Sequence, residues 1–592
     1  MSRLHPTAPA PNVAPAPLAD VVEAVRAAGL LAEDLREGEG AVEIRGMTND
    51  SRAVRPGDLF GAISADTEQG RDGHEFVPAA LEAGASAALV RADYQLPEAE
   101  ASAPVHLGKG EWTASPISGR GRSGLSSAVL VRATDTRAAL AEASAAFYRQ
   151  PGRDLALIGI TGTNGKTTTA VLLHGLLSRL GETAGLVGTI ENRIGSERYA
   201  TAYTTPEAIG LQSLLAAMRD HKVTHVAMEV SSHALALDRV RTLAFRAAVF
   251  TNLTQDHLDF HPTFEHYAAS KRALFSGLAE DAVAVVNADD PAHAEMIRQT
   301  SARVVTYGTA SPADVRVHVL ENAVAGLRLR LDGHERRFKL AGRFNALNLA
   351  AAYAVARDLG YGAMETLDAL AEVEGVPGRF QTVRSADGVL GIVDYAHTPD
   401  ALENVLATAR EIVPEGNALW AVFGAGGDRD RTKRPQMGAI AARLADRVVV
   451  TSDNPRTENP EAILADIRAG LPGPAGEIRT DTMHDVSAPV SAPGARARVT
   501  EFVDRAQAIA HAASQARPGD VIVVAGKGHE DYQIIGTEKR DFNDRQQLSA
   551  ALARRAGGEG QSPVADAVSR ENSSTGSPEG SATGPSPLPT GP

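Results

Sequence analysis

The sequence contains no cysteine among its 592 residues. Disulfide bridges, thiolate metal sites and cysteine nucleophiles are therefore excluded, which suits a reducing compartment. Aromatic residues make up only 4% of the chain, so a surface that stacks nucleic-acid bases is not expected. No apolar run approaches the roughly 18 residues of a membrane-spanning helix, and the N-terminus has no apolar signal segment. We expect a soluble cytoplasmic protein that neither inserts into a membrane nor binds nucleic acid.

Long basic runs are also missing, and the formal net charge is -14. This charge argues against a general surface for nucleic acids or membranes. Any anionic substrate must therefore be met by individual arginines and lysines within a site. A chain of this length is too long for one hydrophobic core, and about three or four domains are expected.

Four segments have compositions that do not favour a folded core. Residues 1–18 are rich in Pro and Ala, and residues 557–592 are rich in Gly, Ser and Pro, so both are predicted to be disordered tails. Residues 94–127 and 486–498 lie between predicted strands and helices, and we interpret them as insertions.

The most informative stretch of the sequence is residues 157–169, LIGITGTNGKTTT. A short apolar run predicts a buried strand, a glycine loop follows, and Lys166 and three threonines open an amphipathic helix. Such a loop turns backbone N–H groups onto a polyphosphate, while the lysine neutralises phosphate charge and Thr167 can hold Mg²⁺. The strict phosphate-loop pattern, G-x-x-x-x-G-K-[ST], would have glycine where Ile160 stands. The first glycine of the pattern is therefore displaced in this sequence. The alternative is a flexible strand-to-helix turn.

Strands and helices alternate on both sides of a β-rich segment at residues 315–340, which we interpret as a hairpin. This alternation predicts an α/β protein with a doubly wound, mainly parallel central sheet and a Rossmann-like C-terminal unit whose alternation begins near Pro377. The predicted domains are an N-terminal domain (19–152), a central phosphate-loop domain (153–342) and a C-terminal domain (343–556).

Three polar residues follow predicted strands of the central domain. Glu229 ends a strand, where its carboxylate would face the phosphate loop and bind Mg²⁺, although a solvated strand end is the alternative. His257 lies beyond the next strand and alone resembles an ordinary loop histidine. Lys271 lies on a half-apolar helix face, where a surface lysine is the alternative. In the N-terminal domain, Asp50, Ser51 and Arg52 could contact a sugar or diphosphate, or form only a turn.

Ten motifs occur in an order that resembles the Mur ligase family. They are GTNGKTT, MEVSSHAL, TNLTQDHLDFH, the Lys271 helix, GRFNALNLAAA, VPGRF, DYAHTP, GAGGDRDRTKRP, TSDNPRTE and AGKGHEDYQ. The resemblance covers about residues 40–556 apart from the insertions. It implies a three-domain ligase of the branch that adds diaminopimelate to UDP-MurNAc-L-Ala-D-Glu with ATP, in peptidoglycan precursor synthesis.

The resemblance also implies which residues bind ATP and Mg²⁺. The catalytic set would be Lys166, Glu229, His257 and Lys271, with Lys271 carbamylated to N6-carboxylysine. Carbamylation would turn a cation into an anionic oxygen ligand. The metal ligands would be Thr167, Glu229, His257 and Lys271. The ATP-binding residues would be Gly162, Thr163, Asn164, Gly165, Lys166, Thr167, Thr168, Asn345, Asn348, Arg379 and Asp394.

The resemblance also implies which residues bind the two other substrates. The UDP-MurNAc-dipeptide would contact Ser51, Thr204, Thr205, Ser231 and Arg239. The diaminopimelate site would comprise Arg429, Asp453, Asn454, Pro455, Arg456, Gly526 and Glu530. Arg456 ends the DNPR sequence, and its planar guanidinium suits the distal carboxylate that distinguishes diaminopimelate from lysine. The segment AISADTEQGRDGHEF is longer than the usual uridine-side loop, and Tyr203 stands where relatives can carry Asn.

The resemblance implies that ATP activates the D-Glu side-chain carboxylate as an acyl phosphate, which the incoming amine then attacks. Catalysis would be mostly positioning and electrostatic stabilisation. The expected partners are the small-molecule substrates, and a monomer is expected. Two alternatives stay open: ligation of L-lysine or another amine, and an ATP-binding regulatory protein without catalytic activity.

Overall fold

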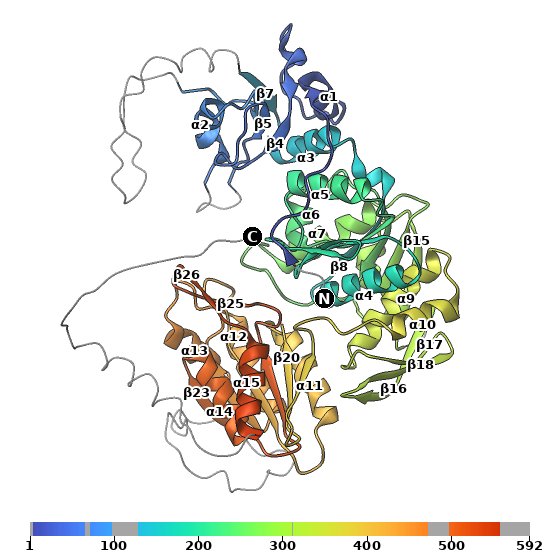
Figure 1. Cartoon of the computed structure of the whole chain (residues 1–592), viewed down its shortest axis with the longest axis vertical. Coiled ribbons are helices and arrows are strands. Elements are labelled where there is room, and N and C mark those ends of the chain that lie inside the picture. Colours follow the sequence, from blue (N-terminus) through green and yellow to red (C-terminus); the bar gives the residue numbers. More distant parts are fainter. Residues whose placement is uncertain (1–3, 66–70, 98–127, 311, 472–496, 557–592) are drawn as a thin grey trace, which may run out of the picture.

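The computed structural model describes residues 4–65, 71–97, 128–310, 312–471 and 497–556. Most of the two predicted insertions, and the whole predicted tail 557–592, lie outside these residues. The described chain forms three α/β units, with the central unit between the other two (Figure 1). Among the described residues, no helix is long and apolar enough to cross a membrane.

The N-terminal unit is a four-stranded parallel sheet with helices on both faces. Buried aliphatic side chains of its strands pack against α1 and α3 on one face and against α2 on the other. The sheet order follows the chain: β4 (Gly46–Thr48), β5 (Asp58–Gly61), β6 (Ala87–Arg91) and β7 (Val129–Ala133). The helices are α1 (Leu18–Ala27), α2 (Val77–Glu82) and α3 (Thr136–Phe147), with the 3-10 turns Glu39–Ala41 and Gly73–Phe76.

Residues 4–17 differ from the disordered tail that composition predicts. The strand β1 (Leu4–His5) pairs in parallel with β11 of the central unit, and β2 (Ala16–Pro17) pairs with β3 (Glu43–Ile44). The Ala200 amide donates to the His5 carbonyl over 2.8 Å, and the Asn12 amide donates to the Asp220 carboxylate over 2.8 Å. Composition misses this segment because its backbone bonds go to residues distant in the sequence.

The central unit contains a 12-stranded, mainly parallel sheet in the order β1-β11-β10-β9-β12-β8-β13-β14-β15-β16-β17-β18. Its first strands along the chain are β8 (Ala156–Thr161), β9 (Ala184–Val187), β10 (Asn192–Ile194), β11 (Glu197–Tyr199) and β12 (His225–Glu229). The later strands are β13 (Phe245–Phe250), β14 (Val283–Asn287), β15 (Arg303–Gly308), β16 (Val315–Ala323), β17 (Gly326–Leu331) and β18 (His334–Phe338). The predicted hairpin at 315–340 is therefore a three-stranded continuation of this sheet.

Helices cover both faces of the central sheet because its inner strands are apolar on both sides. They are α4 (Lys166–Arg179), α5 (Ala208–Asp220), α6 (Ser232–Ala236), α7 (Phe264–Ser276), α8 (His293–Ile297), α9 (Asn345–Asp358) and α10 (Ala363–Ala371), after the 3-10 turn Pro151–Asp154. The apolar side chains of α9 and α10 share a core with β8 and α4. The central unit thus extends to about Val373, beyond the predicted boundary at residue 342.

The C-terminal unit is a six-stranded sheet in the order β19-β20-β24-β21-β22-β23, parallel except at β19. Its strands are β19 (Gln381–Arg384), β20 (Leu390–Asp394), β21 (Leu419–Phe423), β22 (Arg447–Thr451), β23 (Arg498–Phe502) and β24 (Val521–Ala525). A hairpin follows, β25 (Tyr532–Ile535) and β26 (Glu538–Asp541). The helices are α11 (Pro399–Ile412), α12 (Lys433–Leu444), α13 (Pro460–Arg468), α14 (Arg505–Gln515) and α15 (Asp544–Ala556).

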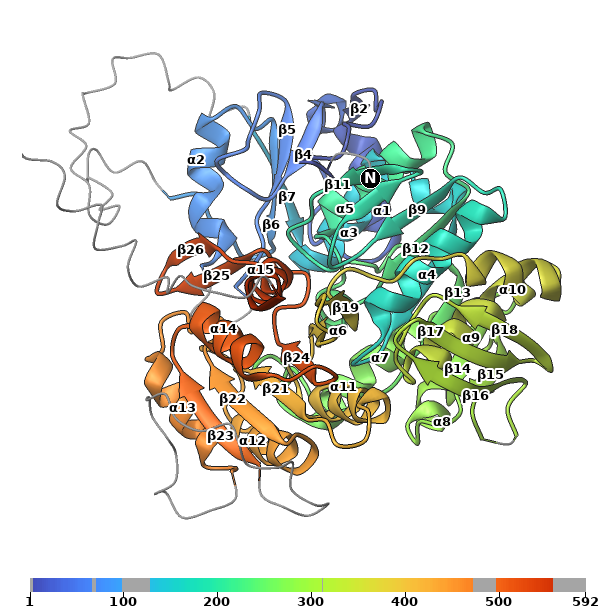
Figure 2. The same cartoon turned by 60° about the horizontal axis from the view of Figure 1, so that its bottom comes forward.

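Figure 2 shows the C-terminal unit facing the central unit across the side where α11 and α7 lie. In both units the parallel strands end at one edge of the sheet, where ligands bind in this class of fold. In the central unit, Glu229 of β12 pairs with Ile160 of β8, and Phe250 of β13 pairs with Thr161. The residues that follow these three strands therefore meet at one edge.

Candidate active site

The predicted phosphate loop joins β8 to α4, and its two glycines have backbone conformations that other residues rarely adopt. Gly162 has φ +147° and Gly165 has φ +88°. A Cβ atom on Gly162 would lie 1.9 Å from Thr251 Oγ1, and one on Gly165 would lie 2.7 Å from Asn348 Oδ1. Both positions thus require glycine, and the predicted strand–loop–helix arrangement is confirmed.

Lys166 begins α4, and its side chain folds back over the loop. Its Nζ atom donates to the carbonyl oxygens of Gly162 and Thr163, each over 2.8 Å. Burial lowers the pKa of this lysine. The ammonium group therefore lies on the loop that would enclose a phosphate chain, at the N-terminus of a helix.

Glu229 lies at the end of β12 and is only 1% exposed. Its Oε2 atom accepts bonds from the Thr167 hydroxyl over 2.9 Å and the Thr189 hydroxyl over 3.1 Å. Its Oε1 atom accepts from the Thr189 amide over 2.7 Å. The alternative of a solvated strand end is therefore wrong. A carboxylate and a hydroxyl in contact are oxygen donors of the kind that Mg²⁺ prefers.

Lys271 lies on α7 and is also only 1% exposed, so the surface-lysine alternative is wrong. Its Nζ atom donates to the Gly162 carbonyl over 2.8 Å and lies 4.4 Å from the centre of the Tyr267 ring. Burial, reinforced by the nearby Lys166 charge, lowers its pKa well below the usual value. A lysine in this state spends more time as the neutral amine, the form that reacts with carbon dioxide.

His257 follows β13 with a left-handed backbone, φ +55°, and its side chain is 41% exposed. Its ring packs edge-on against His233 with the centroids 4.8 Å apart. Of the four predicted metal ligands, Thr167 and Glu229 are in direct contact. Within the described ranges, no three His, Asp or Glu side chains are grouped as a ready-made metal site.

The C-terminal unit contributes directly to the phosphate loop. Arg379 Nη2 donates to the Thr167 hydroxyl over 3.1 Å, and its guanidinium lies 4.3 Å from the Tyr395 ring centre. Asp394 is buried, which raises its pKa, and its carboxylate accepts the amides of Phe380 and Ala396 over 2.7 and 2.8 Å. Asp394 thus holds the turn that carries Arg379.

A second contact between these units was not predicted from the sequence. Asn164 of the phosphate loop donates through Nδ2 to Asp400 Oδ2 over 2.8 Å. Asp400 lies in the first turn of α11. The DYAHTP motif ends one residue before it, which is the only sequence signal for the contact. Together Arg379 and Asp400 fasten the C-terminal unit to the loop.

Asn345 and Asn348 lie at the start of α9, beneath the phosphate loop, and both are buried. Asn348 Nδ2 donates to Asn345 Oδ1 over 2.9 Å, and Asn345 Nδ2 donates to the Ala341 carbonyl over 2.7 Å. The Thr169 hydroxyl donates to Asn348 Oδ1 over 3.3 Å. These contacts fix α9 against α4 next to the loop.

The residues predicted to grip the dipeptide form one connected group beside Glu229. The Thr205 hydroxyl donates to the Glu229 carbonyl over 2.8 Å, and Arg239 Nη1 donates to the Thr205 carbonyl over 3.0 Å. The Ser231 hydroxyl caps α6. The Thr204 and Thr189 hydroxyls lie 3.0 Å apart.

Ser51 lies in the N-terminal unit, in the turn after β4. The Ala53 amide donates to the Asp50 carbonyl over 2.9 Å, and the Arg52 guanidinium binds the Asp50 carboxylate over 2.8 Å. The turn interpretation of this segment is confirmed. A role for Ser51 in substrate binding stays a prediction.

The predicted diaminopimelate residues follow the carboxyl ends of β21, β22 and β24. Asp453 and Asn454 are buried, and Asn454 Nδ2 donates to Glu530 Oε2 over 3.0 Å. Arg456 has a left-handed backbone, φ +51°, and its Nη1 atom donates to the Gly427 carbonyl over 2.7 Å. Sequence reasoning missed Lys527, which is completely buried among these side chains although it belongs to the AGKGHEDYQ motif.

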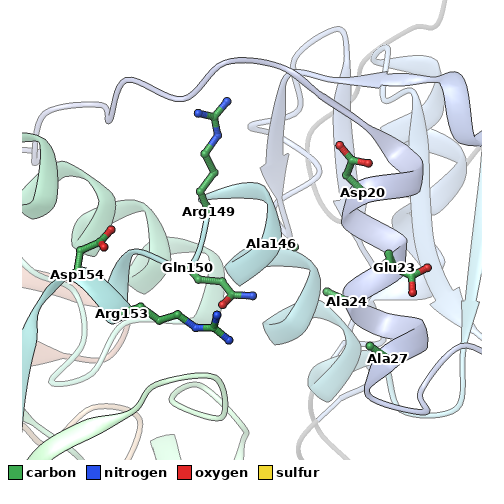
Figure 3. Close-up of a pocket in the computed structure, with 9 residues that line it drawn as sticks. All are labelled: Asp20, Glu23, Ala24, Ala27, Ala146, Arg149, Gln150, Arg153 and Asp154. Atoms are coloured by element: carbon green, nitrogen blue, oxygen red, sulfur yellow. The ribbon is translucent and has the colours of Figure 1, made fainter.

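One groove borders this region, and a second lies where the N-terminal unit joins the central unit. One, of about 560 Å³, lies between the loop after His257 and the C-terminal unit; Leu258, Asp259, Asp428, Arg429, Asp430, Arg431, Thr432 and Glu458 line it. The other, of about 550 Å³, lies between α1 and the end of α3. Figure 3 shows Gln150 and Arg153 pointing across it toward α1. This second groove contains none of the predicted site residues.

Comparisons with known proteins agree with this geometry. The model of the Mur ligase middle domain matches residues 160–356, and that of the Mur ligase glutamate ligase domain matches residues 378–528. The chain is 42% identical over 553 residues to UDP-N-acetylmuramoyl-L-alanyl-D-glutamate--2,6-diaminopimelate ligase of Chlorobaculum tepidum, covering 91% of this chain and 98% of that protein. The protein of the same name from Thermosynechococcus vestitus is 42% identical over 520 residues, covering 87% of this chain and 94% of that protein.

Solved structures show the same fold. The structure of a UDP-N-acetylmuramoyl-L-alanyl-D-glutamate--2,6-diaminopimelate ligase matches with a TM-score of 0.58 and 32% identity, covering 91% of this chain and 99% of that chain. MurF ligase from Thermotoga maritima in complex with ADP matches with a TM-score of 0.54 and 18% identity, covering 87% of this chain and 98% of that chain. From its domains, its site geometry and its relatives, this chain belongs to the Mur ligase family.

Proposed function

We propose that this protein is an ATP-dependent ligase that joins diaminopimelate to the D-Glu side-chain carboxylate of UDP-MurNAc-L-Ala-D-Glu, in peptidoglycan precursor synthesis. The observation that carries the proposal is the Thr167 hydroxyl, which contacts both Glu229 of the central unit and Arg379 of the C-terminal unit. A nucleotide bound at this loop would thus meet both units. The relatives' printed activity supports the choice of substrates.

The reaction must activate a carboxylate, because water does not favour amide formation from a carboxylate and an amine. A D-Glu carboxylate oxygen attacks the γ-phosphorus of ATP, the bond to the β–γ bridging oxygen breaks, and ADP leaves. The amine of diaminopimelate then attacks the acyl carbon, phosphate departs, and the amine loses a proton. Lys166, with its ammonium on the loop, offsets the phosphate charge, and Arg379 adds a second positive charge as the units close.

The oxygen donors at the loop fit Mg²⁺, which usually binds one or two carboxylates together with substrate phosphates. Thr167 and Glu229 would hold it, with His257 and a carbamylated Lys271 completing the assigned set. When bound, the ion supplies charge that stabilises the transferred phosphoryl group. Glu229, meanwhile, orients the Thr167 and Thr189 hydroxyls through its own bonds.

Carbamylation of Lys271 is supported by its burial and its lowered pKa. The neutral Nζ lone pair attacks the carbon of carbon dioxide, a C–N bond forms, and the proton leaves the nitrogen. The product is an anion, so it would replace two neighbouring like charges, Lys166 and Lys271, with an opposite pair. This exchange removes a repulsion that the unmodified side chains retain.

The remaining assigned contacts divide between two substrates. Ser51, Thr204, Thr205, Ser231 and Arg239 would hold the UDP-MurNAc-dipeptide; Arg429, Asp453, Asn454, Pro455, Arg456, Gly526 and Glu530 would hold diaminopimelate. These assignments require no residue of a second chain, and we propose that the protein acts as a monomer. The substrates ATP and the UDP-sugar are those of the cytoplasm, where we place the reaction.

A parallel assay of purified protein tests the proposal. UDP-MurNAc-dipeptide and ATP are incubated with meso-diaminopimelate, LL-diaminopimelate, L-lysine or no amine, and ADP, phosphate and the tripeptide product are measured. We expect product with a diaminopimelate isomer and little with lysine. Preferred use of lysine would favour the alternative acceptor, and no amine-dependent ADP release would favour a regulatory ATP-binding protein.

A further inference from the structure

The C-terminal unit contains a completely buried lysine that no step of the proposed reaction uses. Lys527 follows β24 by two residues, and its side chain is completely buried. A buried ammonium group is costly unless protein acceptors surround it. Its surroundings should therefore explain why it is there.

Three acceptors surround the Lys527 ammonium group. Its Nζ atom donates to Asn454 Oδ1 and to Glu530 Oε2, each over 3.0 Å. It also lies 3.5 Å from Asp453 Oδ1 as an ion pair. An ammonium group has three N–H donors; protein acceptors take two of them, and the Asp453 carboxylate lies beside the group as an ion pair only. Lys527 is therefore placed to hold other side chains and not to contact a substrate.

The cluster of Lys527, Asp453 and Glu530 contains more negative than positive groups. One ammonium group lies between two carboxylates, those of Asp453 and Glu530. The cluster of three thus has a net charge of about -1 at neutral pH. That charge suits the capture of one further cation, such as the ammonium group of an amino acid. Without Lys527, the two carboxylates would lose the cation that lies between them.

An acceptor in the cluster also lacks a donor. Asp453 Oδ1 is buried, and among the described residues it finds no hydrogen-bond donor. Both protein bonds to Glu530 fall on one oxygen, Oε2. A buried acceptor without a donor is unusual in a folded protein. The geometry points to a ligand that brings its own N–H groups.

Lys527 also reaches Arg456 through a chain of hydrogen bonds. Asn454 Oδ1, which accepts from Lys527, also accepts from the Ile534 amide over 3.0 Å. The Arg456 amide in turn donates to the Ile534 carbonyl over 3.1 Å, and the Gly536 amide donates to the Arg456 carbonyl over 2.7 Å. The hairpin β25–β26 thus holds Arg456 in its left-handed conformation, and Lys527 fixes the inner end of that chain.

We infer that Lys527 is the positioning residue of the amino-acid pocket. It sets Glu530 and Asp453 as acceptors for the distal ammonium group of the substrate, and through Asn454 and β25 it orients Arg456 toward the distal carboxylate. The substrate class is a diamino dicarboxylic acid. The inference rests on the proposed function, because it assigns the ligand of that same pocket.

The test compares Lys527→Met and Lys527→Arg with the unchanged full-length protein, with KM values for diaminopimelate and ATP measured separately. The unchanged protein comes first: if it forms no tripeptide with any diamino acid, the proposed function fails. If it is active, Lys527→Met should raise KM for diaminopimelate by about tenfold or more, since buried charged hydrogen bonds are lost. KM for ATP should stay the same, and Lys527→Arg should recover part of the loss.

Arg555→Met is the matched control. Arg555 is a partly buried cation of the same unit that donates to Asp387 over 2.6 Å and to the Ala513 carbonyl over 3.2 Å. Its loss should lower the midpoint of thermal unfolding and leave both KM values unchanged.

Two results would overturn the inference. One is an unchanged KM for diaminopimelate in a folded Lys527→Met protein. The other is an equal rise in both KM values, which would indicate a merely structural role. If Lys527→Met does not fold, Lys527→Arg decides: a planar guanidinium cannot direct three donors as an ammonium group does, so its KM for diaminopimelate should rise, and no rise would refute the inference.

Discussion

Two ammonium groups converge on a single carbonyl oxygen in this protein. Lys166 and Lys271 both donate to the Gly162 carbonyl over 2.8 Å. Burial lowers the pKa of each lysine, and the nearby Lys166 charge lowers the pKa of Lys271 further. The reaction at this loop therefore depends on which of the two lysines stays a cation. In the proposed function this is Lys166, which begins α4, whereas Lys271 becomes a carbamate.

Replacement of Lys271 tests this division. Lys271→Ala removes the side chain proposed to become a carbamate, and we expect kcat to fall by about 10²–10³-fold, as when one electrostatic contact of a transition state is lost. The nucleotide Kd should change little, because Lys166 and the loop backbone remain. The measurements are kcat by ADP release and Kd by nucleotide titration.

Ser270→Ala, at the preceding position of α7, is the control and should keep normal turnover. Near-normal turnover in Lys271→Ala would refute the carbamate.

Arg456 is a second residue whose role can be isolated. We expect Arg456→Ala to raise KM for diaminopimelate by about tenfold or more, because the proposed bidentate contact with the distal carboxylate would be lost, and to leave KM for ATP unchanged. Arg456→Lys keeps the charge but not the planar fork, so it should be intermediate. Residue 456 has a left-handed backbone. Arginine, alanine and lysine all carry a Cβ atom, so neither variant changes the backbone strain at this position. Equal effects on both KM values would contradict the specificity argument.

At the scale of elements, the segment 4–17 acts as a strap between the N-terminal and central units. It starts as β1 on the edge of the central sheet and ends next to α1. The strand it pairs with, β11, leads directly into the loop that carries Thr204 and Thr205. The strap therefore covers a sheet edge and braces a loop assigned to the dipeptide.

Deletion of residues 2–12 should reveal this bracing. Loss of the β1 pairing and of the Asn12–Asp220 bond should lower the midpoint of thermal unfolding by about 2–4 °C and raise KM for UDP-MurNAc-dipeptide. Glu197→Gln removes only the ion pair to His5, an exposed contact, and should have little effect. An unchanged KM for UDP-MurNAc-dipeptide in the deletion protein would show that the strap covers the sheet edge but does not support the dipeptide loop.

At the scale of the whole molecule, the central and C-terminal units meet through the phosphate loop itself. Asn164 and Asp400 are 236 residues apart in the sequence, and Arg379 and Thr167 are 212 apart. Each pair joins a loop residue of one unit to a residue near a strand end or helix start of the other. The relative position of the units is thus coupled to the loop that would bind the nucleotide.

Asp400→Ala tests this coupling. The Asn164 amide would lose its acceptor, so we expect KM for ATP to rise by about three- to tenfold, the cost of one ordinary hydrogen bond. Asp400→Asn retains an acceptor oxygen and should be closer to the unchanged protein. Both variants are measured at saturating dipeptide and amine. If Asp400→Ala keeps the original KM for ATP, the contact does not contribute to nucleotide binding.

Much of the fold could be predicted from the sequence because buried parallel strands are short, continuous apolar runs. The strands β14, β20, β21 and β24 are such runs, at Val283–Asn287, Leu390–Asp394, Leu419–Phe423 and Val521–Ala525. The glycine loop before Lys166 was also predictable, since strand, glycines, lysine and helix occur together. Local sequence thus determined these elements and the position of Glu229 at the end of β12.

Other features depended on contacts between distant residues, and only the tertiary structure decided them. Lys271 looked like a surface lysine until α7 brought it against Gly162, 109 residues away. Lys527 gained its role from Asn454, 73 residues away. The Pro/Ala-rich strap was ordered by pairing with β11, and α9 joined the central core. Sequence patterns record which face of an element is apolar, but a buried charge or an edge pairing is stabilised by its partner, and the fold alone brings that partner near.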